Sequence, residues 1–186
     1  MIQVCLLSGC GASSQVRDAI ERPSKASPLA HEIRLEIDES SLKWGDCQLG
    51  TILKERLVEN KTFTKVHYPI YPPHTDPLKL KVVAHGNKDE DSTGFLKAFF
   101  TGLLLFLPVG IIQYEDNFTV SVDMWVNKKE RVLGPVKISS VVEVRHTLFS
   151  KAERYTPDAR AKGFADLANR IITELRNQED WFFKNS

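Results

Sequence analysis

Side chains of the types that carry catalysis or bind metals are few in this chain and widely spaced. The histidines, at His31, His67, His74, His85 and His146, include no pair at the three- or four-residue spacing of a helical metal site. The sequence has no nucleophile-elbow motif and no glycine-rich phosphate loop. These patterns predict no catalytic residues, no metal site and no cofactor, and therefore a protein that is not an enzyme.

The cysteines differ in their surroundings. Cys10 follows Leu7-Ser8-Gly9 and precedes the small residues from Gly11 to Ser14. This stretch resembles the lipobox of bacterial lipoproteins, in which the bond before the cysteine is cut and its thiol is diacylated. The resemblance implies lipidation at Cys10 and makes residues 1–9 a signal peptide, truncated beside the roughly 15–30 residues of secretory signals. The alternative is a buried first strand from Ile2 to Leu7.

Composition limits the class of partner. The 186 residues carry a formal net charge of +1 and are 42% hydrophobic, which is enough for one domain with a proper core. Basic residues are dispersed among acidic ones, so no field is present that would bind nucleic acid. We therefore expect a single α/β domain over residues 32–180, preceded by an extended, mobile tether over residues 10–31.

Hydrophobic periodicity predicts the elements of this domain. Alternation indicates strands over residues 33–38, 66–71, 78–85, 118–126 and 136–149, with a charged hairpin turn between the last two. Helical spacing indicates helices over residues 46–60 and 156–175, the second capped by Thr156 with Pro157 at its first position. The order predicts an α+β fold, a two-layer sandwich with a mainly antiparallel sheet and helices packed on it.

One apolar segment lies between these strands. From Ala98 to Ile112 there are 15 residues without charge, ten of them Leu, Ile, Val or Phe. A membrane-spanning helix needs about 20 such residues, and Pro108 and Gly110 also disfavour a straight span. One interpretation is a buried helix over residues 95–107. The other is an exposed contact surface for a partner or a membrane, with protein contact favoured, formed by Phe99, Phe100, Leu103, Leu104, Phe106 and Leu107.

The lipobox-like stretch, the element order and the apolar run from Gly102 to Pro108 together resemble small lipoproteins of the Gram-negative envelope. The order is similar to the domain of the curli-secretion, penicillin-binding-protein-activator and Pel polysaccharide lipoproteins, and to the N-terminal domain of TolB. The resemblance implies a non-enzymatic accessory or assembly factor that binds envelope proteins or itself. Gly11 in place of an aspartate implies transfer of the lipid-anchored chain to the outer membrane, facing the periplasm.

A different class of function remains open at this point. His67 and His74 bracket a loop with prolines and Tyr71, and these three side chains could line a polar pocket. The chain would then be a soluble cytoplasmic enzyme or a small-ligand-binding domain, and the match at Cys10 would be accidental.

Overall fold

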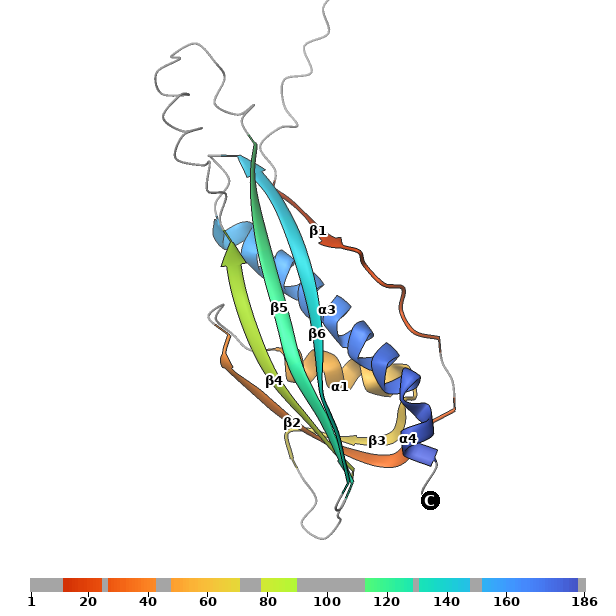
Figure 1. Ribbon diagram of the computed structural model, residues 1–186. Coiled ribbons are helices and arrows are strands. Elements are labelled where there is room, and N and C mark those ends of the chain that lie inside the picture. Colours follow the sequence, from red (N-terminus) through yellow and green to blue (C-terminus); the bar gives the residue numbers. More distant parts are fainter. Residues whose placement is uncertain are drawn as a thin grey trace, which may run out of the picture.

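The computed structural model describes residues 12–24, 27–42, 48–70, 78–89, 113–128, 131–147 and 152–183. They form an α+β fold in which a curled, mixed sheet is packed against helices (Figure 1). The six strands lie in the order β1-β6-β5-β4-β2-β3. The sheet is mixed, so the expectation of a mainly antiparallel sheet was wrong.

The parallel part of the sheet comes from a strand–helix–strand unit. β2 (Ala30–Ser41) leads through α1 (Leu49–Glu59) to β3 (Phe63–His67), which pairs with β2 in parallel. β4 (Leu78–Asp89) then pairs in parallel with the other side of β2. A helix between two adjacent strands returns the chain to the starting end of the sheet, and this makes the pair parallel.

The antiparallel part is built on the longest strands. β5 (Gln113–Lys128) pairs with β4 on one side and with β6 (Arg131–Thr147) on the other. The β5–β6 register shifts between Met124 and Val126, opposite Gly134, which has φ +115. A Cβ at Gly134 would lie 2.5 Å from the carbonyl oxygen of Met124, so this bulge requires glycine.

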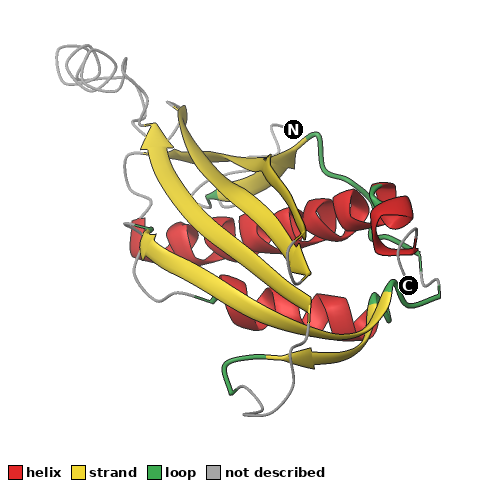
Figure 2. Cartoon of the chain, turned by 60° about the horizontal axis from the view of Figure 1, so that its bottom comes forward, coloured by secondary structure: helices red, strands yellow, loops and turns green. Residues whose placement is uncertain are grey.

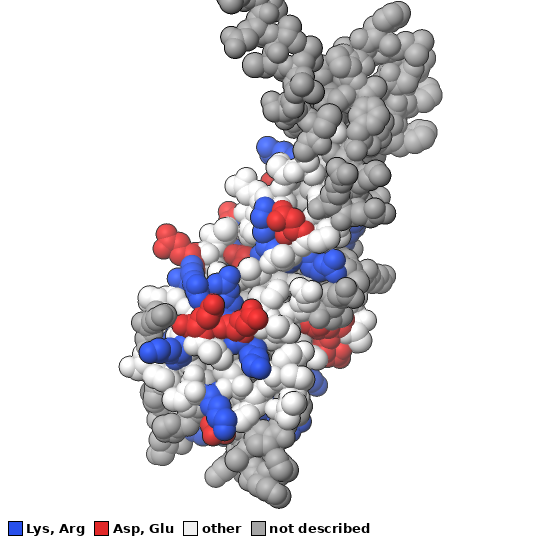
Figure 3. Space-filling model, turned by 180° about the vertical axis from the view of Figure 1, so that it is seen from behind, with Lys and Arg blue, Asp and Glu red and all other residues white. Residues whose placement is uncertain are grey.

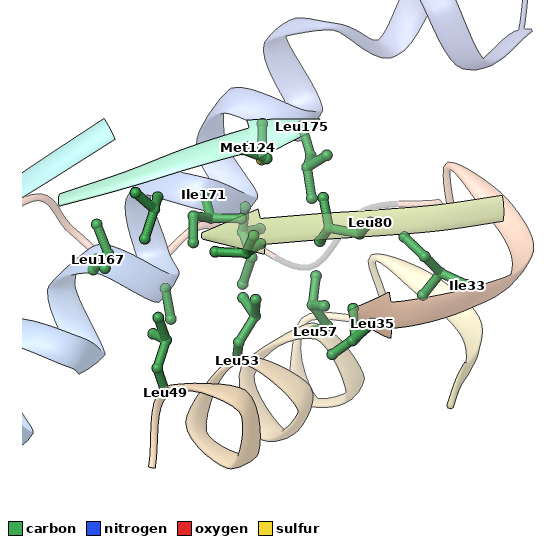
Figure 4. Close-up of a cluster of buried hydrophobic side chains, with 14 of the residues drawn as sticks. Ile33, Leu35, Leu49, Leu53, Leu57, Leu80, Met124, Leu167, Ile171 and Leu175 are labelled. Carbon is green, nitrogen blue, oxygen red and sulfur yellow. The ribbon is translucent and has the colours of Figure 1, made fainter. Parts of the chain in front are cut away.

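Two helices cover one face of the sheet (Figure 2). α3 (Ala152–Asn177) crosses it lengthwise, and the short α4 (Glu179–Phe183) follows. Leu49, Leu53 and Leu57 of α1 point toward strand residues of the core, while α3 contributes Leu167, Ile171 and Leu175 (Figure 4). Full burial of each such side chain stabilises the fold by about 1.5–3 kcal/mol.

The N-terminal segment differs from the extended and mobile tether that its composition predicts. β1 (Ser13–Arg17) pairs antiparallel with residues Val141–Arg145 of β6. Beyond β1 the chain turns toward α3, where the Ile20 amide donates to Asp166 at 3.1 Å. The described part of residues 10–31 is therefore attached to the domain.

Several boundaries also differ from those that periodicity predicts. The second predicted strand, residues 66–71, is β3 at Phe63–His67, and α1 begins at Leu49 after Gln48, which makes no side-chain cap. Thr156 does not cap α3, because that helix already begins at Ala152 and holds Pro157 within its first two turns. Pro157 is the sixth residue of the helix, past the first turn, so it removes one backbone hydrogen bond to the carbonyl group four residues earlier.

Candidate functional site

The residues that the sequence singles out as functional lie mostly outside the described part of the chain. This holds for Cys10 and for the predicted contact residues Phe99, Phe100, Leu103, Leu104, Phe106 and Leu107. Tyr71 and His74 of the alternative pocket also lie outside it. His67 is described, and its Nε2 lies 3.1 Å from Oε2 of Glu32, so a neighbouring carboxylate already occupies this nitrogen.

The strand registers nevertheless show where the chain enters and leaves the undescribed segments. Ser13 of β1 pairs with Arg145, and Gln113 of β5 pairs with Thr147, the last residue of β6. Asp89 ends β4 at the same end of the sheet (Figure 1). We call this the β1 end. The first residue of β1 and both residues that flank segment 90–112 are therefore brought to one end of the domain.

A polar cluster fills the core at the β1 end. It consists of one carboxylate, two basic groups and two tyrosines: Lys88, Tyr114, Asp116, His146 and Tyr155. We call it the Asp116 cluster. Asp116 is 5% exposed, and its Oδ2 lies 3.3 Å from Lys88 Nζ, 3.2 Å from His146 Nε2 and 3.5 Å from the Tyr155 hydroxyl.

His146 is held from several directions within this cluster. Its ring stacks between those of Tyr114 and Tyr155, with centroid distances of 5.7 and 4.8 Å. Nδ1 lies 3.3 Å from the carbonyl oxygen of Thr147, while Nε2 is at ion-pair distance from Asp116 without hydrogen-bond geometry. Both nitrogens of the His146 ring therefore face oxygen atoms.

The chemistry of this cluster is that of a structural ion network. A buried carboxylate is stable only where opposite charges and hydrogen bonds replace water, and Asp116 receives both. The participating side chains come from β4, β5, β6 and α3, so the network ties the ends of these elements together. Sequence analysis missed it because Asp116 and His146 had no recognisable partner. One signal in the sequence could have indicated the cluster. Asp116 stands between Tyr114 and Phe118 at the inward positions of a strand, where a charged residue needs a buried partner.

A second polar group joins β1 to α3 near the same end. The Ser14 hydroxyl donates to Asp158, and Lys162 donates to the Ser14 carbonyl oxygen at 3.0 Å. Lys162 Nζ also lies 2.8 Å from Asp158 Oδ2. Hydrogen bonds from Lys162 and Ser14 lower the pKa of Asp158 from its ordinary 3.8. Charged groups therefore fix the strand that follows Cys10.

Other surface features provide little for ligand binding. A hollow of about 240 Å³ is lined by Gln48, Pro157, Arg160, Ala161 and Phe164, which is below the roughly 300–1,000 Å³ of ligand pockets. Figure 3 shows acidic and basic side chains interspersed on the face seen from behind. Among the described residues, no group of His, Cys, Asp and Glu side chains could hold a metal ion, and no helix is long and apolar enough to cross a membrane.

Comparison with known proteins identifies the fold. No family model matches the sequence, and no curated protein sequence matches it significantly. The structure is similar to a minor lipoprotein from Acinetobacter baumannii, with a TM-score of 0.52 and 14% identity over 79% of this chain and 94% of that one. It also matches the rare lipoprotein B from Shewanella oneidensis, with a TM-score of 0.45 and 15% identity over 80% and 96% of the two chains.

The described part of the chain thus has the α+β fold of a bacterial envelope lipoprotein, and the predicted resemblance to that class is confirmed. This likeness rests on the path of the chain rather than on shared side chains, since identity is only 14%. The fold alone assigns neither an anchor nor a partner.

Proposed function

We propose that this chain is a lipid-anchored lipoprotein of the outer membrane, facing the periplasm, which binds or assembles other envelope components and is not an enzyme. The observation that supports it best is the fold shared with the minor lipoprotein. The sequence adds a lipobox-like stretch whose cysteine, Cys10, lies three residues before Ser13 of β1. Three extended residues span at most about 10 Å, so an acyl chain at Cys10 holds the β1 end close to the bilayer.

Palmitate labelling tests the anchor. Cells that express the gene from its own locus are expected to incorporate radioactive palmitate into this protein, and Cys10→Ser abolishes the label. Cys5→Ser is the matched control, because it removes a second cysteine near the same end without touching the position after Gly9. A label that persists in Cys10→Ser, or is absent from the unchanged protein, would refute the anchor.

The partner-binding half of the proposal concerns segment 90–112. Both flanking residues, Asp89 and Gln113, lie at the β1 end. We propose that Phe99, Phe100, Leu103, Leu104, Phe106 and Leu107 contact an envelope protein or a second copy at this end. Phe100→Asp with Leu104→Asp should remove high-mass species from mild-detergent extracts but leave palmitate labelling intact. Unchanged high-mass species would count against this contact, whereas loss of the label would point to misfolding or mislocalisation.

A polar ligand pocket is the second candidate function, and the structure offers little for it. Of its three predicted residues, His67 already contacts Glu32, and the side chain of His67 is only 10% exposed. The hollow lined by Gln48, Pro157 and Phe164 does not include His67 among its lining residues. The accessory role is therefore the better supported proposal.

A further inference from the structure

The outer edge of β6 is only partly covered. On its inner side, β6 pairs with β5 along nearly its whole length, from Arg131 to Thr147. On its outer side, β1 pairs only with Val141–Arg145. Residues 131–140 therefore have no strand on this side in the described part of the chain. Unpaired backbone groups along a strand edge are a template for another extended segment.

The chain leaves this edge at a defined residue. Asp18 follows β1 with φ 50, a left-handed conformation that ends the strand. Arg170 of α3 then donates to the Asp18 carbonyl oxygen at 2.5 Å, and the Ile20 amide bonds to Asp166 at 3.1 Å. These contacts direct the chain toward α3. Strand β1 therefore ends opposite Val141, and residues 131–140 of β6 extend past it.

Of the uncovered residues 131–140, only those that follow Pro135 can accept a strand. Pro135 has no amide hydrogen, and Gly134 belongs to the bulge opposite Met124 and Val126. Such features protect an edge against pairing. The stretch from Val136 to Ser140 lies between this bulge and β1, and five residues of a strand span about 17 Å. We call it the β6 free edge.

A second copy of the chain does not fit the β6 free edge well. An antiparallel copy centred on Ile138 would bring its residues 131–135 opposite residues 141–145, where β1 already lies. A register that avoids β1 would put Pro135 and Gly134 of both copies at the centre of the pair, where proline cannot donate. The geometry thus favours a short extended peptide from a different protein.

Charge specifies what that peptide carries. Lys137 is exposed and makes no ion pair with any described residue. Asp123, directly across on β5, lies instead 3.5 Å from His85 Nε2 through its Oδ2. An acidic residue directly opposite a lysine on the neighbouring strand stabilises pairing, and a basic residue there weakens it.

We propose that the β6 free edge binds an extended acidic segment of a partner protein, which adds to the sheet in line with β1. The segment pairs its backbone with Val136–Ser140 and places a carboxylate opposite Lys137. This inference goes beyond the proposed function, since it needs no acyl chain and uses none of the residues from Phe99 to Leu107.

Amide hydrogen exchange on the full chain tests the inference with two synthetic peptides. The probes are acetyl-Val-Thr-Val-Glu-Val-amide, whose fourth residue lies opposite Lys137 when the peptide pairs antiparallel with Val136–Ser140, and its counterpart with lysine in place of glutamate. We expect the glutamate peptide to slow exchange within residues 136–140 and to bind about two- to five-fold more tightly than the lysine peptide. The proposal would be overturned if neither peptide, at a saturating concentration, slowed exchange within residues 136–140. Equal affinity of the chain for both peptides would also overturn it.

Two variants make the test specific. Lys137→Glu should reverse the preference between the peptides, whereas Lys81→Glu, an exposed lysine on the interior strand β4, should leave it unchanged. Light scattering on the chain without peptide measures its molecular mass and so tests whether a second copy of the chain binds at this edge. A mass above that of one chain that falls on Lys137→Glu would assign the edge to a second copy and overturn the proposal of a different partner.

Discussion

Asp116 is a buried charge on which the packing of several elements depends. Its carboxylate is buried between Lys88 and His146, which come from strands on either side of it. The sequence contains all three residues, but they are 28 and 30 positions apart, and strand register alone brings them together. Local patterns cannot predict such a cluster, because it depends on which strands are neighbours.

Asp116→Asn should destabilise the domain by about 2 kcal/mol, since it removes the counter-charge of Lys88. Lys88 is 28% exposed, so water compensates for part of the loss. The control is Glu115→Gln on the preceding position, where the carboxylate is 45% exposed and 3.6 Å from Arg145. That change should alter the free energy of unfolding by less than about 1 kcal/mol in urea titrations. Equal effects of both variants would disprove the role given to the Asp116 cluster.

Among the strands of the described residues, β1 is the one that the sequence analysis did not predict. Its residues, Ser-Ser-Gln-Val-Arg, have little alternation, and the contacts that hold it come from distant parts of the chain. Arg17 lies 2.5 Å from Glu143 of β6, and Ser14 contacts Asp158 of α3. A short polar strand at a sheet edge is stabilised by such partners rather than by its own propensity.

Attachment of β1 to α3 should weaken in acid. The pKa of Asp158 is lowered from 3.8 in the folded protein, so its contribution is fully present above the unfolded value and is lost as the pH falls below 3.8 through the folded pKa. We expect the amides of β1 to exchange faster over this range relative to those of β4. In Asp158→Asn, β1 should lack this acid-dependent step. A step of the same size in the variant would show that another group is responsible.

Close contact between α3 and the sheet depends on Gly163. A Cβ at this position would lie 3.2 Å from Val142 and 3.5 Å from Val120. Gly163→Leu should therefore destabilise the domain by about 1–3 kcal/mol through overpacking. Ala161→Leu, at an exposed position of the same helix, should stay within about 0.5 kcal/mol by thermal or urea unfolding. A tolerated leucine at Gly163 would mean that α3 moves away from the sheet without cost.

At the scale of the whole molecule, the sequence predicted one half of the fold better than the other. Long alternation over residues 118–126 and 136–144, and the apolar stripe of α3, belong to elements that the structure confirms. The mixed character of the sheet was missed, because alternation within β2 and β4 does not say that they pair in parallel. The predicted site remains a prediction, since Cys10 and Phe99–Leu107 lie outside the described residues.

Orientation at the membrane follows from the position of β1. If Cys10 holds the chain, Arg145 at the β1 end lies nearer the bilayer than Lys65 of β3, although both side chains are 61% exposed. In a Cys47→Ser background, a fluorophore at Arg145→Cys should be quenched by nitroxide-labelled lipid headgroups more strongly than one at Lys65→Cys. Equal quenching at the two positions would exclude a fixed orientation.

The central claim is that Cys10 carries the lipid, and the mass of the N-terminal tryptic peptide tests it most directly. No Lys or Arg lies between Met1 and Arg17, so trypsin leaves Cys10 in one peptide that ends at Arg17. For protein extracted from membranes, we predict a peptide from Cys10 to Arg17 with the added mass of a diacylglyceryl group. An unmodified peptide that still contains residues 1–9 would contradict the account.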